Sequence, residues 1–217
     1  MGRGRPRAAP LSFMNYSKVT EMKKSTAHIW CAALLTVSAA AQAAPAGDVA
    51  AGKEKSQVCA ACHGPDGNST DPQYPILAGQ TWRYLYLQMK DYKEGRRTNE
   101  FMTPLMKDMS KKDMYDLAAY YSEQPHNGQN SKGDPSKLEQ GRKVAEAALC
   151  TMCHLGGFKG QNEVPRVAGQ HYEYVRKQLL AFKNKQRTND AGTMTAYMSD
   201  VTPEQIDAVA SYVSSLE

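Results

Sequence analysis

Apolar side chains recur at intervals of three and four residues in several separate stretches of the chain. Two stretches have almost the same spacing: Trp82, Leu85, Met89 and Tyr92, and later Tyr172, Val175, Leu179 and Phe182. Residues spaced in this way share one face of an α-helix. No stretch alternates apolar and polar residues as a half-buried strand would. The pattern therefore predicts an all-α fold.

Two further helices begin with capping signals. Ser110-x-x-Asp113 and Thr202-Pro203-x-Gln205 each place a hydroxyl at the expected N-cap, and the second adds proline at the first helical position. An apolar face follows each signal: Met114, Leu117, Ala118 and Tyr121 in one case, and Ile206, Val209, Ala210 and Val213 in the other. We expect each helix to close one of two similar units.

The second half of the chain repeats the first at an offset of 90 to 92 residues. The repeated segments are Cys59-x-x-Cys62-His63 with Cys150-x-x-Cys153-His154, Pro75–Gln80 with Pro165–Gln170, Arg97–Glu100 with Arg187–Asp190, and Met102–Met106 with Met194–Met198. We therefore predict two domains, residues 44–124 and 134–217, joined by a polar linker at 125–133. Asp134-Pro135 should cap the first helix of the second domain. A unit this small lacks apolar volume of its own, which a bound cofactor could supply.

The charge of the chain is concentrated at its N-terminal end. The whole sequence has a formal net charge of +5, and residues 1–43 carry six basic side chains against one acidic side chain. The remaining residues hold 21 basic and 21 acidic side chains. This balance gives no basic surface for a nucleic acid.

Residues 1–43 are typical of a secretory leader. Lys23-Lys24 precede an apolar run, Ile29–Ala41, and Ala41-Gln42-Ala43 matches an A-x-A cleavage site. We expect the natural start at Met22 and the loss of Cys31 with the leader. The apolar run is too short to span a membrane, and no later stretch qualifies. The mature protein is therefore expected in the periplasm.

The repeated C-x-x-C-H motif is the attachment site of c-type haem. Its cysteines form thioethers with the porphyrin, and its histidine ligates the iron. We therefore predict two covalently bound haem c groups, attached through the thiols of Cys59, Cys62, Cys150 and Cys153. His63 and His154 are the expected proximal iron ligands. This use leaves no cysteine of the mature chain for a structural disulfide.

The sixth iron ligand decides between an electron carrier and a catalyst. Methionines occur at equivalent positions in both halves, as Met102 with Met194 and as Met106 with Met198. The first pair is placed by the pattern in a loop after Arg-Thr-Asn, from which a side chain could cover the haem, but the repeat alone leaves both pairs open. Met109 and Met114 have no methionine counterpart and are interpreted as packing residues.

Two histidines outside the motifs are interpreted as structural. His126 is placed in the linker, where we expect it to be solvent-exposed, and His171 opens a helix. The counterpart of His171 is Thr81, so a ligand role would have no equivalent in the other half. Pro75 and Pro165 follow the two motifs, and they either stiffen a loop or offer a carbonyl to the proximal histidine.

Together, the paired C-x-x-C-H, P-x-L/V-A-G-Q, R-T-N-D/E and M-T-x-x-M segments resemble the dihaem cytochrome c4 family from Ala46 to the C-terminus. The resemblance implies two class I cytochrome c domains related by a pseudo-twofold axis, with haem propionates near the interface. It also implies Met102 and Met194 as distal ligands, and carbonyl acceptors at Pro75 and Pro165.

The resemblance further implies a soluble or loosely membrane-attached periplasmic protein that carries single electrons and is not an enzyme. Expected partners are a haem-copper terminal oxidase and a quinol-cytochrome c reductase. An alternative is the dihaem electron-accepting subunit of a periplasmic dehydrogenase for sulfide, sulfite or an alcohol. A dihaem peroxidase would need a vacant iron site, against which the paired methionines argue.

Overall fold

The computed structural model describes residues 46–128 and 130–217. The expected leader, with its start at Met22, Cys31 and the cleavage site, lies outside the described residues. Within them the chain is helical, and the only pairing of extended segments is an isolated bridge between Gln161 and Val164. The all-α prediction is confirmed. None of the helices in this part of the chain has the length and hydrophobicity needed to cross a bilayer.

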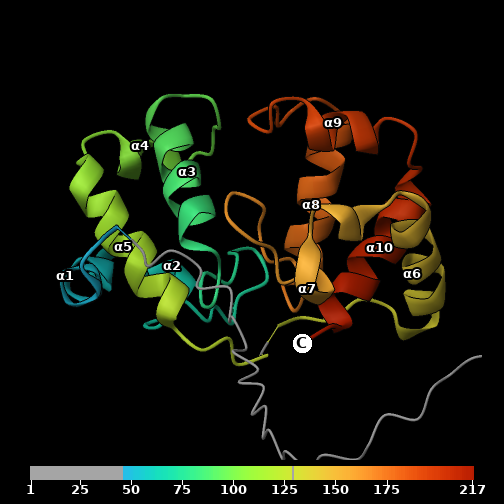
Figure 1. Ribbon diagram of the computed structural model, residues 1–217, viewed down its shortest axis with the longest axis horizontal. Coiled ribbons are helices and arrows are strands. Elements are labelled where there is room, and N and C mark those ends of the chain that lie inside the picture. Colours follow the sequence, from blue (N-terminus) through green and yellow to red (C-terminus); the bar gives the residue numbers. More distant parts are fainter. Residues whose placement is uncertain (1–45, 129) are drawn as a thin grey trace, which may run out of the picture. The chain divides into compact units, whose positions relative to one another are not determined.

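Each half contains the same succession of helices (Figure 1). In the first half these are α1 (Val49–Lys55), η1 (Ser56–Val58), α2 (Ala60–His63), α3 (Trp82–Lys93), α4 (Met102–Met106) and α5 (Lys111–Glu123). In the second half they are η2 (Pro135–Lys137), α6 (Leu138–Ala147), η3 (Cys150–Met152), α7 (Leu155–Phe158), α8 (Tyr172–Lys183), α9 (Thr193–Met198) and α10 (Pro203–Ser215).

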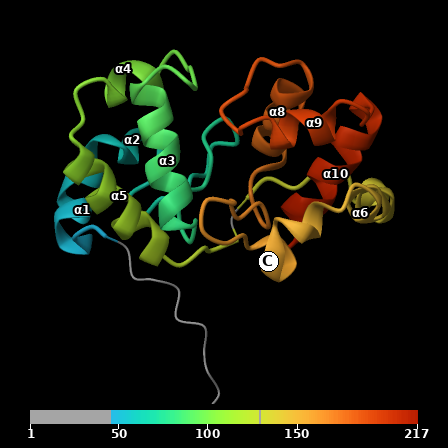
Figure 2. The ribbon, with the colours of Figure 1, turned by 45° about the horizontal axis from the view of Figure 1, so that its top comes forward.

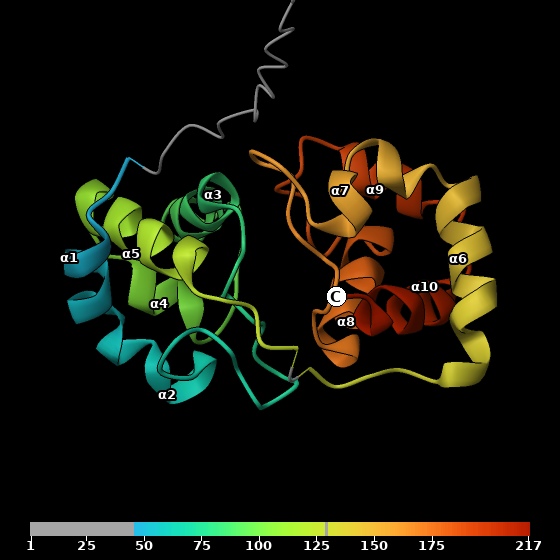
Figure 3. The same cartoon turned by 60° about the horizontal axis from the view of Figure 1, so that its bottom comes forward.

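The first and last helices of each half pack against each other at a glycine. α1 lies against α5 and α6 against α10, as Figure 2 and Figure 3 show. A Cβ atom on Gly52 would lie 2.0 Å from the carbonyl oxygen of Asp116, and one on Gly141 would lie 2.0 Å from that of Ala208. Only glycine allows the two backbones to approach this closely.

The helix caps form as the sequence predicts. The Ser110 hydroxyl accepts from the Asp113 N–H at the start of α5. Thr202 and Gln205 complete a reciprocal capping box at α10. Asp134 caps η2, which leads directly into α6. These interactions are local, so the sequence contains all the information that specifies them.

Apolar side chains from the helices form a separate core in each half. The buried members of the first core lie on α3 and α5: Leu85, Leu117, Ala118, Tyr120 and Tyr121. Those of the second half form two clusters: Ala145, Phe158, Ala168, Val175, Val209, Ala210 and Val213, and then Phe182, Met198, Val201 and Ile206. The helix faces predicted from the spacing of apolar residues therefore point inward.

The segment between the halves is hydrogen-bonded to both of them. Asn68 of the first half donates to the Pro125 carbonyl, and Asn130 donates to the Ser214 carbonyl at 2.6 Å. His126 is half-buried, and its Nε2 lies 3.1 Å from the carbonyl oxygen of Gly169. The expectation that His126 is solvent-exposed is therefore wrong, because the polar residues of this segment pair with backbone groups of the second half.

Candidate cofactor sites

Each C-x-x-C-H segment closes a single turn of backbone. The His63 N–H donates to the Cys59 carbonyl at 2.9 Å, and the His154 N–H donates to the Cys150 carbonyl at 3.0 Å. The first turn is α-helical, whereas Cys150–Met152 is 3₁₀ and His154 leaves the helical region. Both turns bring two thiols and one imidazole together, as the motif predicts.

Each histidine of these motifs is fixed by a proline carbonyl. Nδ1 of His63 lies 2.9 Å from the Pro75 oxygen, and Nδ1 of His154 lies 2.9 Å from the Pro165 oxygen. A carbonyl only accepts, so Nδ1 carries the proton and Nε2 keeps its lone pair in the neutral ring. Burial lowers the pKa of both imidazoles, although the carbonyl contact acts in the opposite direction. Both rings are thus prepared to ligate a metal through Nε2.

The second half encloses a cavity of about 730 Å³. Its wall includes Cys150, Cys153 and His154, together with Met194 and Met198. Most of the remaining wall is apolar and comes from α6, α8 and α10 and the segments beside them, including Val144, Phe158, Val167, Val175, Leu179, Phe182, Ile206, Val209 and Val213. Thiols, an imidazole and thioethers around one apolar space are the donor set of a c-type haem. The residues of this cavity fit that group.

The two candidate methionine pairs differ in burial. Met106 and Met198 are 2% and 4% exposed, and Met198 packs in the core with Phe182 and Ile206. Met102 and Met194 are only partly buried. The core methionines therefore already have apolar neighbours, while the other pair keeps some accessible surface.

Met102 and Met194 lie in short helices, not in loops. Met102 begins α4, and Met194 is in the first turn of α9. The Asn99 side chain accepts from the Met102 N–H at 2.9 Å, and Asp190 accepts from the Thr195 N–H at 2.7 Å. The loop expectation is wrong because polar side chains just before each methionine hold the backbone in a helical turn.

A polar cluster joins the halves, and three of its residue types come from both. Arg97 donates to Tyr174 Oη and Gln178 Oε1, both at 2.9 Å. In the opposite direction Arg187 donates to the equivalent residues of the first half, to Tyr84 Oη at 3.1 Å and Gln88 Oε1 at 3.0 Å. The sequence analysis found the Arg-Thr-Asn repeat but missed this role. The tyrosine and glutamine recur at the same offset of 90 residues, a signal that could have found it.

His171 also contributes to the contact between the halves. It is 1% exposed, its Nε2 lies 2.9 Å from the Ser69 carbonyl oxygen, and its Nδ1 accepts from the Ser131 N–H at 2.9 Å. Both ring nitrogens are therefore engaged in a neutral ring that donates from Nε2. The residue opens α8, as predicted, and holds protein groups on both sides.

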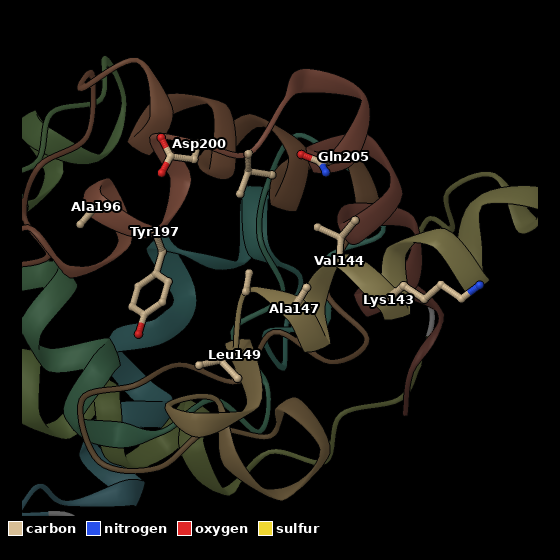
Figure 4. A pocket seen from close by; sticks show the side chains of 10 residues that line it. Lys143, Val144, Ala147, Leu149, Ala196, Tyr197, Asp200 and Gln205 are labelled. Carbon is tan, nitrogen blue, oxygen red and sulfur yellow. The ribbon is translucent and has the colours of Figure 1, made fainter.

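A second hollow of about 550 Å³ adjoins the cavity (Figure 4). Five residues line both spaces: Val144, Ala148, Leu149, Tyr197 and Val201. In Figure 4, Lys143 extends away from the other labelled side chains. Leu149 and Tyr197 are 51% and 46% exposed, so an apolar surface surrounds the outer side of the cavity.

Comparison with known proteins places this arrangement in a family. The sequence matches the Cytochrome c family over residues 49–124 and again over 138–217. Cytochrome c4 of Pseudomonas aeruginosa is 41% identical over 194 residues, covering 84% of this chain and 96% of the relative. The crystal structure of reduced cytochrome c4 from Pseudomonas stutzeri superposes with a TM-score of 0.74 at 36% identity, covering 79% of this chain and all of that chain.

A third relative has a different printed role. The thiosulfate dehydrogenase electron acceptor of Thiomonas intermedia is 31% identical over 199 residues, covering 84% of this chain and 89% of the relative.

The two matched regions and the paired motifs define a tandem c-type cytochrome, an electron-transfer protein with two covalently bound haem c groups. The chain belongs to the dihaem cytochrome c4 family.

Proposed function

We propose that Cys59, Cys62, Cys150 and Cys153 are the haem attachment points and that His63 and His154 are the proximal iron ligands. The support is that both histidines are buried, neutral and fixed through Nδ1 by a proline carbonyl. Pro75 and Pro165 thereby orient the imidazoles and increase the electron donation of Nε2.

Met102 and Met194 are the distal ligands in this proposal. Met106 and Met198 are packed in the interior, so using them would leave core positions empty. The haem, when bound, supplies an iron that exchanges one electron. A thioether favours the ferrous state and completes the coordination sphere, so the chain suits electron transfer and leaves no site for peroxide.

The protein serves in this proposal as a periplasmic one-electron carrier of a respiratory chain. It accepts electrons from a quinol-cytochrome c reductase and passes them to a haem-copper terminal oxidase. The observation that carries the proposal is that both halves present the same donors, one imidazole and a partly buried methionine beside a core methionine. Two equivalent filled centres suit relay of single electrons.

A second candidate is the electron-accepting subunit of a periplasmic dehydrogenase. The relative from Thiomonas intermedia, named for thiosulfate dehydrogenase, supports this alternative. In that case the exposed apolar surface at Leu149 and Tyr197 would contact a catalytic subunit, not a mobile partner.

Reconstitution distinguishes the two candidates. The purified holoprotein would be added to membranes that contain the reductase and the oxidase but lack other soluble cytochromes. We expect quinol-dependent oxygen uptake to rise with the amount of holoprotein. Failure in this assay, together with rapid reduction by thiosulfate plus its dehydrogenase, would favour the alternative.

A further inference from the structure

The polar cluster between the halves departs from the internal symmetry at one buried carboxylate. Asp91 lies on α3 and is 1% exposed, and its counterpart on α8 is Ala181. Its neighbour Arg96 likewise corresponds to Gln186. The first half therefore contributes an ion pair to the boundary, and the second half has no equivalent.

Asp91 has partners from both halves. Arg96 donates to its Oδ1 through Nε at 2.8 Å and through Nη2 at 2.7 Å. Asn189 of the second half donates to its Oδ2 at 2.6 Å. A buried carboxylate with both oxygens occupied is held in one position and stays ionised beside a guanidinium.

Asn189 can cross the boundary because another residue has taken over its local task. In the first half Asn99 accepts from the N–H groups of Phe101 and Met102. The second half has two additional residues in this segment, since the offset grows from 90 at Asn189 to 92 at Met194. There Asp190 accepts the backbone N–H groups, which frees the Asn189 amide to donate to Asp91.

The ion pair also belongs to the wall of the second half's cavity. Asp91 and Arg96 both line the cavity that contains Cys150, His154 and Met194. Arg96 is 46% exposed, so water screens its charge more than that of Asp91, which is 2% exposed by its side chain. The compensation is therefore incomplete, and net negative character remains in the wall.

We propose that Asp91 is a positioning residue of the first half that lowers the reduction potential of the second haem. The inference rests on the proposed attachment at Cys150 and Cys153. Ferric iron carries one more positive charge than ferrous iron, and a fixed negative charge in a poorly polarisable wall stabilises it. The two haems thereby acquire different potentials through a residue outside the second half's own sequence.

The test is a spectroelectrochemical titration of the holoprotein followed by paramagnetic NMR. Signals of the second haem are those lost in Met194→Ala. Asp91→Asn should change the ferrous-to-ferric ratio of the second haem several-fold in favour of ferrous at a fixed potential, and should change the first haem much less. Arg96→Gln should move the second haem in the opposite direction, and this half-exposed position decides alone if Asp91→Asn does not fold.

Two control variants separate charge from packing. Asp116→Asn removes an equally buried carboxylate of the first half that pairs with Lys55 and Lys112, and it should leave the second haem unchanged. Asn189→Ala removes the hydrogen bond without removing a charge and should have a smaller effect than Asp91→Asn. The proposal is overturned if neither charge variant moves the second haem, or if both move it in the same direction. A wild-type second haem without methionine ligation would instead refute the proposed function.

Discussion

Gln80 and Gln170, at equivalent positions of the two halves, each bind the backbone of the other half through both atoms of the amide. Gln80 donates to the Arg166 carbonyl at 2.8 Å and accepts from the Arg166 N–H at 2.7 Å. Gln170 donates to the Ile76 carbonyl at 2.9 Å and accepts from the Ile76 N–H at 2.8 Å. Ile76 and Arg166 are themselves equivalent. Such reciprocity is the signature of a twofold relation between two surfaces.

The first prediction concerns this exchange. Gln170→Ala leaves the buried N–H and carbonyl of Ile76 without partners, so we expect the free energy of unfolding to fall by about 1–3 kcal/mol. Denaturant unfolding measures the change, and the two halves should begin to unfold separately. Gln161→Ala, at an exposed position, is the control and should stay within about 0.5 kcal/mol of wild type. Equal stability of the two variants would rule out a structural role for the exchange.

The second prediction separates the two methionine pairs. Met102→Ala should open the first haem to carbon monoxide and leave the second closed, because a distal thioether is lost. Met106→Ala should lower stability by about 2–5 kcal/mol by creating a cavity but should admit no carbon monoxide. Optical spectra under carbon monoxide distinguish the variants. Binding by the Met106 variant alone would reverse the ligand assignment.

The third prediction concerns the crossing of α6 and α10. Gly141→Ala places a methyl group 2.0 Å from the Ala208 carbonyl oxygen before relaxation. The helices must separate, at a cost of about 1–3 kcal/mol, even though alanine favours the helix more than glycine does. Thermal unfolding measures the loss. Gln140→Ala, on an exposed position of the same helix, should change little.

The fourth prediction is a pH dependence that arises from His171. Burial lowers its pKa in the folded protein, with the Ser69 carbonyl partly opposing the shift. The unfolded chain then binds a proton at about pH 6.5, before the folded chain does, so stability should decline as the pH falls below that value. Asp71 and Glu173 are the acidic groups that favour the charged ring, and they do not reverse the direction.

Denaturation of the wild type and of His171→Thr between pH 7 and pH 5 tests this dependence. Threonine stands at the equivalent position 81 of the first half and does not titrate in this range. The slope of stability against pH should therefore be smaller in the variant. An unchanged slope would assign the effect to other groups.

Local patterns predicted much of the fold. The caps at Ser110 and Thr202 and the apolar faces of α3 and α8 depend on residues within one or two turns, so short sequence windows specify them. The C-x-x-C-H segments likewise form single turns. The repeat then extended each local prediction to both halves.

Contacts between distant residues could not be predicted in the same way. Gln80 and Arg166 are 86 positions apart, and Asp91 and Asn189 are 98 positions apart. Nothing in either local sequence specifies the partner. The placement of His126 failed for the same reason, since its partner Gly169 lies 43 positions away.

The account depends above all on two irons that each have an imidazole and a thioether ligand. Magnetic circular dichroism of the resting, oxidised holoprotein reads the spin state and the methionine-to-iron charge-transfer band of both haems. We predict two low-spin, six-coordinate centres, with half of the methionine band lost in Met102→Ala and half in Met194→Ala. A high-spin, five-coordinate haem in the wild-type protein would contradict the account.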